Sequence, residues 1–305
     1  MRSETKGTFS ICAVDAARGE VGCAVQSRYF AVGNVVPWAK ARVGAVATQA
    51  AGVAAYGPRI LGLLEQGLAP AEAIDAALGE DAGRESRQIG VVAADGRAAT
   101  HTGSQCIAWA GHRTGAGYAV QGNILAGEAV VTEMERVFLE TGGSLVERLV
   151  SALEAGQAAG GDSRGQQSAA VVVERIGAAS EFRDGLDRVC DLRVDDHAAP
   201  IAELRRLLGI HLVWDALRRA SAHHAPGRYA EGAAILSEAL DQQGEDAVLL
   251  YDLACFECLS GENEAALIHV ARALELDPAL LGGAALDSDF EALREDARFQ
   301  ALVRG

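Results

Sequence analysis

The chain lacks the features that would suit nucleic acid, a membrane or an oxidising compartment. Its formal net charge is −15 and it has only two lysines, Lys6 and Lys40, so no basic face for nucleic acid is visible. No run approaches the ~18 continuous apolar residues of a membrane span, and the start MRSETKGTF lacks the apolar core of a signal peptide. The six cysteines are scattered within apolar segments, which is typical of reduced thiols. These absences predict a cytoplasmic protein that binds neither nucleic acid nor membrane.

Aromatic residues are also scarce, at 5% of the chain, although 50% of the residues are hydrophobic. The core is therefore expected to consist mainly of Ala, Val and Leu. The 35 glycines show no short period, which excludes a fibrous repeat and predicts many tight turns. A chain of 305 residues is long enough for two domains.

The pattern of the first two hundred residues alternates strands with pairs of helices. Amphipathic helices are predicted for PRILGLLEQG and PAEAIDAALG, and again at 128–140 and 144–154. Asp95-Gly96 predicts a hairpin turn. Strands are predicted at 8–15, 21–27, 43–50, 88–94, 98–102, 118–122, 168–174 and 190–194.

This order differs from regular βαβ alternation and predicts antiparallel sheets with helices on their outer faces. The strand SAAVVVE is apolar on both faces, as expected where one sheet packs on another and is covered by helices. The predicted fold class is α+β, with a four-layer α/β/β/α sandwich over residues 8–199 after a leader of residues 1–7.

From Pro200 onwards the composition becomes helical. Three pairs of identical residues lie 34 positions apart: Gly227 and Gly261, Ala239 and Ala273, Leu240 and Leu274. This is the period of tetratricopeptide repeats, in which helical hairpins bury their faces by stacking on neighbours. Residues 200–305 are therefore predicted to form an all-α, tetratricopeptide-like domain.

Several long motifs resemble a bacterial family called domain of unknown function 1028. They include TFSICAVD, SRYFAVGNVVPWAKARVGAVATQA, AYGPRILGLLEQG, HTGSQCIAWAGHRTGAGYAVQGN and LEAGQAAGGDSRGQQSAA. The resemblance covers about residues 8 to 210. It implies the fold of the N-terminal-nucleophile hydrolases, but it brings no established reaction, because fold alone does not define function.

Thr8 is the candidate nucleophile that this resemblance implies. Enzymes of the wider superfamily use an N-terminal Thr, Ser or Cys whose own α-amine accepts the proton. Thr8 opens the first predicted strand and follows Gly7, a junction that resembles the self-processing site of proteasome β subunits. The alternative is that Thr8 only opens a strand, and an uncleaved leader would leave it without its amine. Ser10, on the same strand face, is a weaker candidate.

Other polar residues near strand ends or in glycine-rich loops are candidates for the same site. Asn123 could donate to an oxyanion, and Lys40 could support the nucleophile electrostatically, as a lysine does in the proteasome. Each could equally be structural. Substrate binding is predicted for Arg28, Gln49, His101, Asp162 and Arg164.

No cofactor or metal is expected. The glycine-rich stretches HRTGAG and GGDSRG lack the Lys-Ser/Thr of a phosphate-binding loop. Cys255 and Cys258 have metal-ligand spacing, but no second pair accompanies them, and buried small residues of a helix are the better interpretation.

Two classes of function remain open. The first is an amidohydrolase or peptidase of the N-terminal-nucleophile type that cleaves a C–N bond in a small amide or peptide. The second is a catalytically silent protein whose helical repeats dock a protein partner or drive homo-oligomerisation.

Overall fold

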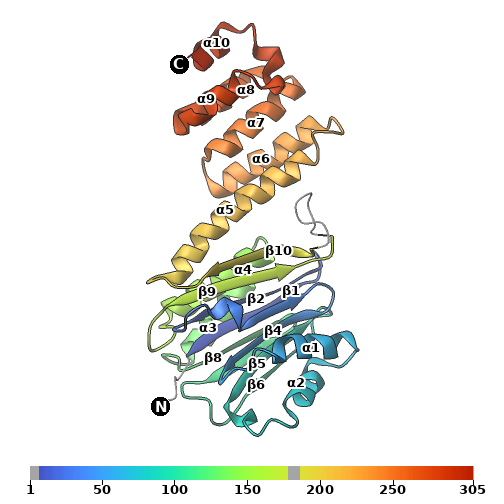
Figure 1. Ribbon diagram of the computed structural model, residues 1–305, viewed down its shortest axis with the longest axis vertical. Coiled ribbons are helices and arrows are strands. Elements are labelled where there is room, and N and C mark those ends of the chain that lie inside the picture. The colour runs from blue at the N-terminus through green and yellow to red at the C-terminus, as the bar shows by residue number, and fades with distance from the viewer. Residues whose placement is uncertain (1–6, 178–185, 305) are drawn as a thin grey trace. The chain divides into compact units, whose positions relative to one another are not determined.

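The computed structural model describes residues 7–177 and 186–304, which divide into two compact units between Leu208 and Gly209. Within the described residues, the first unit contains ten strands in two antiparallel sheets, and the second unit is helical (Figure 1). The structure thus confirms a mixed α and β chain with two antiparallel sheets and a helical C-terminal region. The expected boundary between residues 199 and 200 differs from the observed division, which lies within helix α5 (Pro200–Ser221). The first half of α5 belongs to the first unit, where Arg205 binds Glu154.

The larger sheet has the strand order β10-β9-β2-β1-β8-β7. Its central hairpin aligns Thr8 with Ser27 and Asp15 with Glu20, so two strands of equal length pair without a shift. The strand bounds are β1 Thr8–Asp15, β2 Glu20–Ser27, β7 Gly111–Gly115, β8 Tyr118–Asn123, β9 Ser168–Glu174 and β10 Arg188–Val194.

The smaller sheet has the order β3-β4-β5-β6. Its β5–β6 hairpin turns at Asp95-Gly96, where Gly96 has a φ of 88° and Asp95 Oδ1 accepts a hydrogen bond from Arg97 N. The predicted turn is therefore confirmed. The bounds are β3 Pro37–Lys40, β4 Gly44–Ala50, β5 Arg87–Ala93 and β6 Ala98–Thr102, with short 3₁₀ segments at Val32–Asn34 and Arg84–Ser86.

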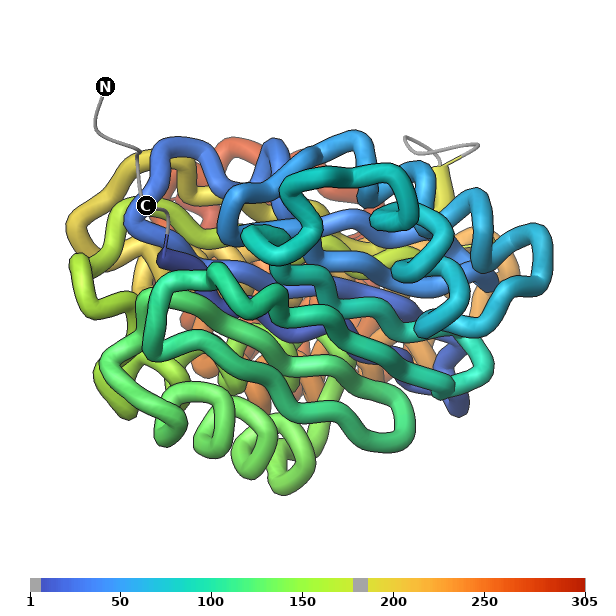
Figure 2. The backbone as a smooth tube through the Cα atoms, turned by 90° about the horizontal axis from the view of Figure 1, so that it is seen from below, coloured from blue at the N-terminus to red at the C-terminus, as the bar shows by residue number. Residues whose placement is uncertain are grey.

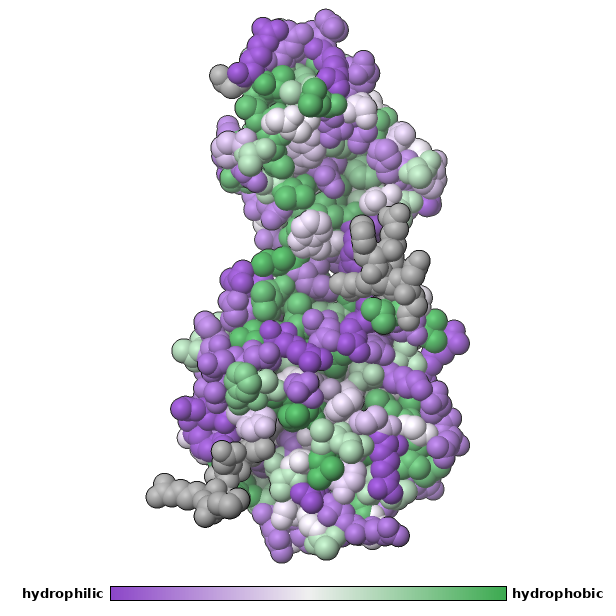
Figure 3. Space-filling view, in the orientation of Figure 1, coloured by the Kyte–Doolittle hydropathy of each residue, from purple (hydrophilic) through white to green (hydrophobic). Residues whose placement is uncertain are grey.

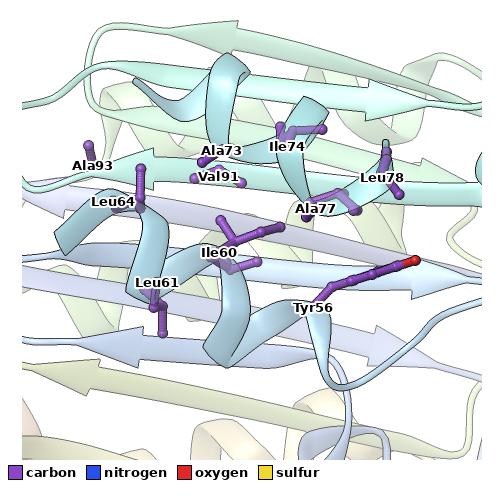
Figure 4. Packing of buried hydrophobic residues seen from close by; sticks show 12 residues of the cluster. Tyr56, Ile60, Leu61, Leu64, Ala73, Ile74, Ala77, Leu78, Val91 and Ala93 are labelled. Atoms are coloured by element: carbon purple, nitrogen blue, oxygen red, sulfur yellow. The ribbon is translucent and has the colours of Figure 1, made fainter. Parts of the chain in front are cut away.

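The two sheets pack face to face, and each is covered by a pair of helices. Small side chains fill the space between the sheets, among them Cys12, Val25, Ala45 and Val92. Helices α1 (Tyr56–Glu65) and α2 (Pro70–Leu78) pack on the smaller sheet, where Ile60, Ile74 and Leu78 meet Val91 (Figure 4). Helices α3 (Ala129–Glu140) and α4 (Leu145–Ala158) pack on the larger sheet. Figure 2 shows the light-green α3 region across the strands from the blue α1 segment.

Local signals explain where these helices begin. Ser144 and Glu147 form a capping box at α4, with Glu147 Oε2 accepting from Ser144 N at 2.9 Å. Pro70 occupies the first turn of α2, where a missing N–H costs nothing. The helices predicted at 128–140 and 144–154 are therefore confirmed, within a few residues at their ends.

The second unit is a series of helical hairpins. Gly261 ends α7 with a φ of 92°, and Asp246 caps its start by accepting from Val248 N and Leu249 N. The elements are α6 Tyr229–Gln243, α7 Ala247–Ser260, α8 Asn263–Leu276, η3 Pro278–Leu280, α9 Leu281–Ala284, η4 Ser288–Leu293 and α10 Ala297–Arg304.

On the face shown in Figure 3, hydrophilic and hydrophobic residues are interspersed. Among the described residues, no helix combines the length and the apolar character needed to cross a membrane.

Candidate active site around Thr8

Thr8 lies at the end of the central strand of the larger sheet and is almost fully buried. Its neighbours in register are Ser27 on β2 and Asn123 on β8, and side chains directly opposite one another share a face of the sheet. The hydroxyl oxygens of Thr8 and Ser27 are 3.0 Å apart. The strand order therefore places two hydroxyls and one amide together at this edge.

The carbonyl oxygen of Gly7 is the point on which these groups converge. Thr8 Oγ1 and Ser27 Oγ each donate to it at 2.6 Å, and Arg164 Nη2 donates at 2.8 Å. One carbonyl thus receives hydrogen bonds from two hydroxyls and a guanidinium. Donors on a carbonyl oxygen make its carbon more electrophilic and stabilise the negative charge that a nucleophile would create there.

Asp162 holds this arrangement from the loop between α4 and β9. Its side chain is fully buried and accepts hydrogen bonds from Arg28 N, and from Arg164 N, Nε and Nη2, at 2.7–3.1 Å. A buried carboxylate needs such partners, and the bidentate guanidinium fixes the direction of Arg164. A Cβ built on Gly7 would lie 2.6 Å from Asp162 Oδ1, so only glycine fits at position 7.

A buried network of amides lies beside Thr8, between the two sheets. Gln49 Nε2 and Asn123 Nδ2 both donate to Gln88 Oε1 at 2.9 Å, and Ser10 Oγ donates to Gln49 Oε1 at 2.6 Å. Gln49 Nε2 also lies 3.4 Å from the carbonyl oxygen of Thr8. The network fixes the position of Asn123 and of the backbone at Thr8.

The same network continues outwards to a histidine. Gln88 Nε2 donates to Thr102 Oγ1 at 3.0 Å, and Thr102 Oγ1 lies 2.9 Å from His112 Nδ1. Desolvation lowers the pKa of His112 below its ordinary value, with a smaller contribution from His101, so the neutral form is favoured.

The structure brings most of the predicted site residues together. Thr8, Asn123 and Gln49 lie in this cluster, and so do Asp162, Arg164 and the backbone of Arg28. Ser10 belongs to the amide network and not to the groups around the Gly7 carbonyl.

Two predicted residues lie elsewhere. Lys40 is at the far end of the β3–β4 pair, opposite Gly44, and its Nζ binds Glu65 Oε2 at 2.6 Å on the surface. Five residues of strand separate Gly44 from Gln49, which corresponds to about 17 Å. His101 Nε2 lies 2.9 Å from the carbonyl oxygen of Arg84. Neither residue is within the arrangement around Thr8.

Sequence reasoning missed Ser27 and Gln88. The signal for Ser27 was available, because strands of equal length on either side of the turn at 16–19 place it opposite Thr8. Gln88, the second residue of β5, is fully buried although it is polar, and a buried polar residue beside an apolar strand segment is a useful signal.

A pocket of about 230 Å³ borders Thr8, and we call it the Thr8 pocket. Apart from three serine or threonine residues, a tyrosine and an amide, its walls are aliphatic or glycine. The lining residues are Thr8, Ser27, Tyr29, Val32, Val35, Val36, Thr48, Gln49, Ala50, Gly52 and Ala54.

The helical unit contains a separate cluster of acidic groups. One ligand atom each from Cys255, Asp287 and Asp289 lies within 4.8 Å of the others. Asp287 is engaged as the cap of η4 and accepts a hydrogen bond from Tyr251 Oη at 2.9 Å. Cys255 and Cys258 are buried in α7, as the interpretation of small core residues predicts. Desolvation, followed by repulsion from Asp287 and Asp289, raises the pKa of Asp252 to about 6.

The first unit is thus an α and β protein with a polar site at one end of its central strands. The chain belongs to the family of unknown function DUF1028, which matches residues 8–204. It is also similar to the crystal structure of protein SPO2555 from Silicibacter pomeroyi, described as a member of the same family. The identity is 30% and the TM-score 0.60, over 66% of this chain and 88% of that one. No curated protein matches the chain.

Proposed function

We propose that the first unit is an amide hydrolase of the N-terminal-nucleophile type, with Thr8 as its nucleophile. The observation that carries the proposal is the Gly7 carbonyl, which receives hydrogen bonds from Ser27 and Arg164 while Thr8 Oγ1 lies 2.6 Å from its oxygen. The order of layers, with two face-to-face sheets between two pairs of helices, supports the same class.

The first reaction would be cleavage of the chain's own Gly7–Thr8 bond. Thr8 Oγ1 attacks the Gly7 carbonyl carbon, the C–N bond breaks, and the hydroxyl proton moves to the nitrogen that becomes the α-amine. Water then hydrolyses the resulting ester, which releases a carboxylate on Gly7 and restores the Thr8 hydroxyl. Ser27 and Arg164 would stabilise the developing oxyanion.

The second reaction would be turnover of an amide substrate. The freed α-amine of Thr8 titrates at a pKa of about 8 and can accept the hydroxyl proton near neutral pH. Attack on the substrate carbonyl gives an acyl ester on Thr8, and the leaving amine takes the proton. Water then releases the acid. Asn123 would donate to the oxyanion, a role supported by its register with Thr8, and its Nδ2 also donates to Gln88 Oε1.

The test is the intact mass of the full-length protein, tagged at its C-terminus. We expect the wild type to lack residues 1–7, Thr8→Ala to retain them, and Thr8→Ser to be processed, because serine supplies the same hydroxyl. Thr114→Ala, at an exposed position on edge strand β7, is the matched control and should be processed like the wild type. Retention of the leader in the wild type, or its loss from Thr8→Ala, would contradict self-cleavage. Retention would favour a silent binding protein.

A further inference from the structure

The Thr8 pocket borders Thr8 through walls that do not include Gly7. Thr8 and Ser27 line it, whereas, within the described residues, Gly7, Asp162 and Arg164 are outside its walls. Because Thr8 forms part of its wall, a group that becomes attached to Thr8 Oγ1 can extend into the Thr8 pocket.

The walls of the pocket are chemically simple. Val32, Val35, Val36 and Ala54 present methyl groups, and none of the described lining residues carries a formal charge. A charged ligand group would lose its hydration in this pocket without gaining a counter-charge from those walls.

The polar groups of the lining are already engaged within the protein. Thr48 Oγ1 donates to the carbonyl oxygen of Val53 at 3.2 Å. The amide of Gln49 binds Ser10 through its oxygen and Gln88 through its nitrogen. Because these groups are engaged, the pocket favours an apolar occupant over a strongly polar one.

The size of the pocket limits the occupant further. A volume of about 230 Å³ is below the range of roughly 300–1,000 Å³ that is typical of drug-sized ligands. It suits a short branched aliphatic group.

We propose that the Thr8 pocket binds the acyl side of the substrate, and that this side is a short, uncharged aliphatic group, as in a branched-chain carboxamide. The assignment to the acyl side rests on the proposed function, because the acyl group is the part that stays attached to Thr8 in the ester. The preference for a small neutral aliphatic ligand depends only on the walls of the pocket.

Binding of small amides to the full-length protein tests this preference without requiring turnover. The probes are isobutyramide, succinamic acid and 4-aminobutanamide, which are neutral, anionic and cationic at neutral pH, and the measurement is a ligand-observed NMR titration. We expect isobutyramide to bind the wild type with a Kd on the order of millimolar, as suits a ligand of so few atoms. The two charged amides should bind at least ~10-fold more weakly.

Two matched variants connect this binding to the pocket. Ala54→Leu fills the lining with a larger side chain and should weaken isobutyramide binding at least ~10-fold. Ala55→Leu, one residue further on at an exposed position outside the lining, should bind like the wild type. Equal binding by Ala54→Leu, no binding to the wild type, or equal binding of the charged amides would overturn the proposal.

The outcome is separable from that of the proposed function. The intact masses of the wild type and Thr8→Ala report on self-cleavage whether or not any amide binds. Processed protein that binds isobutyramide should also release isobutyrate and ammonia from it, and Thr8→Ala should bind it without releasing either. Release without dependence on position 54 would retain the nucleophile and reject the pocket as the acyl site.

Discussion

At the scale of single residues, the site depends on a glycine packed against a buried carboxylate. Asp162 is held by the Arg28 backbone and by Arg164, so its position is fixed on several sides. Gly7 packs directly against it, because a Cβ at position 7 would lie 2.6 Å from Asp162 Oδ1. The hydrogen bonds from Ser27 and Arg164 to the Gly7 carbonyl are made at this close approach, so we expect a side chain at position 7 to disturb them.

Replacement of Gly7 by alanine tests that dependence. In Gly7→Ala the new methyl group would approach Asp162 to 2.6 Å, so the carbonyl should move away from Arg164 and Ser27. We expect processing to slow at least ~10-fold, followed by intact mass over time after synthesis. Gly62→Ala in α1, where a Cβ meets nothing within 4 Å, should be processed at the wild-type rate. Equal rates for the two variants would show that the contact has no influence.

From the sequence, it was possible to predict polar residues of this site that stand at a strand start or in a glycine-rich loop. It was not possible to predict the residues that meet them across strands and sheets. Thr8 and Asp162 stand out by their position at a strand start and in a glycine-rich loop. Ser27 and Gln88 do not, because their roles arise from strand pairing and sheet packing. Lys40 was singled out because lysine is rare, and rarity carries no information about distance.

At the scale of elements, hydrophobic pattern and turn chemistry predicted the central strands and two of the four edge strands. The strands Thr8–Asp15 and Ser168–Glu174 begin and end where expected. Two strands were missed, Pro37–Lys40 and Gly111–Gly115, and both are edge strands. Edge strands are short, tolerate proline and glycine, and expose side chains, so they lack the apolar pattern of a buried strand.

The helical hairpins of the second unit follow the 34-residue spacing. Gly227 and Gly261 both have positive φ, and Ala239 and Ala273 are both buried. Equivalent positions thus have equivalent roles, although membership of the tetratricopeptide class stays a prediction. Gly232, near the start of α6, allows α7 to approach closely, because a Cβ there would lie 2.3 Å from the ring of Phe256.

A substitution at this contact between α6 and α7 separates the effect of packing on stability from the effect of helix propensity. Gly232→Ala should gain up to ~1 kcal/mol of helix propensity but lose about 1–3 kcal/mol through overpacking against Phe256, so a net loss of stability is expected. Gly209→Ala in α5, with nothing within 4 Å of its Cβ, should be neutral or stabilising. Chemical denaturation followed by circular dichroism measures both. A Gly232→Ala protein as stable as Gly209→Ala would mean that the helices adjust at no cost.

At the scale of the whole molecule, negative charge is in large excess. Its effect on the free energy of unfolding depends on whether the carboxylates are exposed or partly buried. The formal net charge is −15, and most described arginines form ion pairs with nearby acidic groups on the surface. Such exposed pairs each contribute ~1 kcal/mol or less. The cluster of Asp252, Asp287 and Asp289 is different, because partly buried carboxylates there repel one another.

Burial and this repulsion raise the pKa of Asp252 from an ordinary 3.8 to about 6, so they predict the direction in which stability changes with pH. The folded chain holds the proton more tightly than the unfolded chain, so it binds more protons between about pH 4 and pH 6, and stability is lost as the pH rises through that interval. A shift of two units corresponds to about 3 kcal/mol as an upper bound.

Asp252→Asn removes the ionisation, so it should raise the free energy of unfolding at pH 8 by up to that amount and change it little at pH 4. Asp241→Asn, an exposed position on α6, should show no such pH-dependent gain. Denaturation of both variants at the two pH values decides the matter, and a gain at pH 8 equal to that at pH 4 would show that Asp252 ionises in the folded chain without penalty.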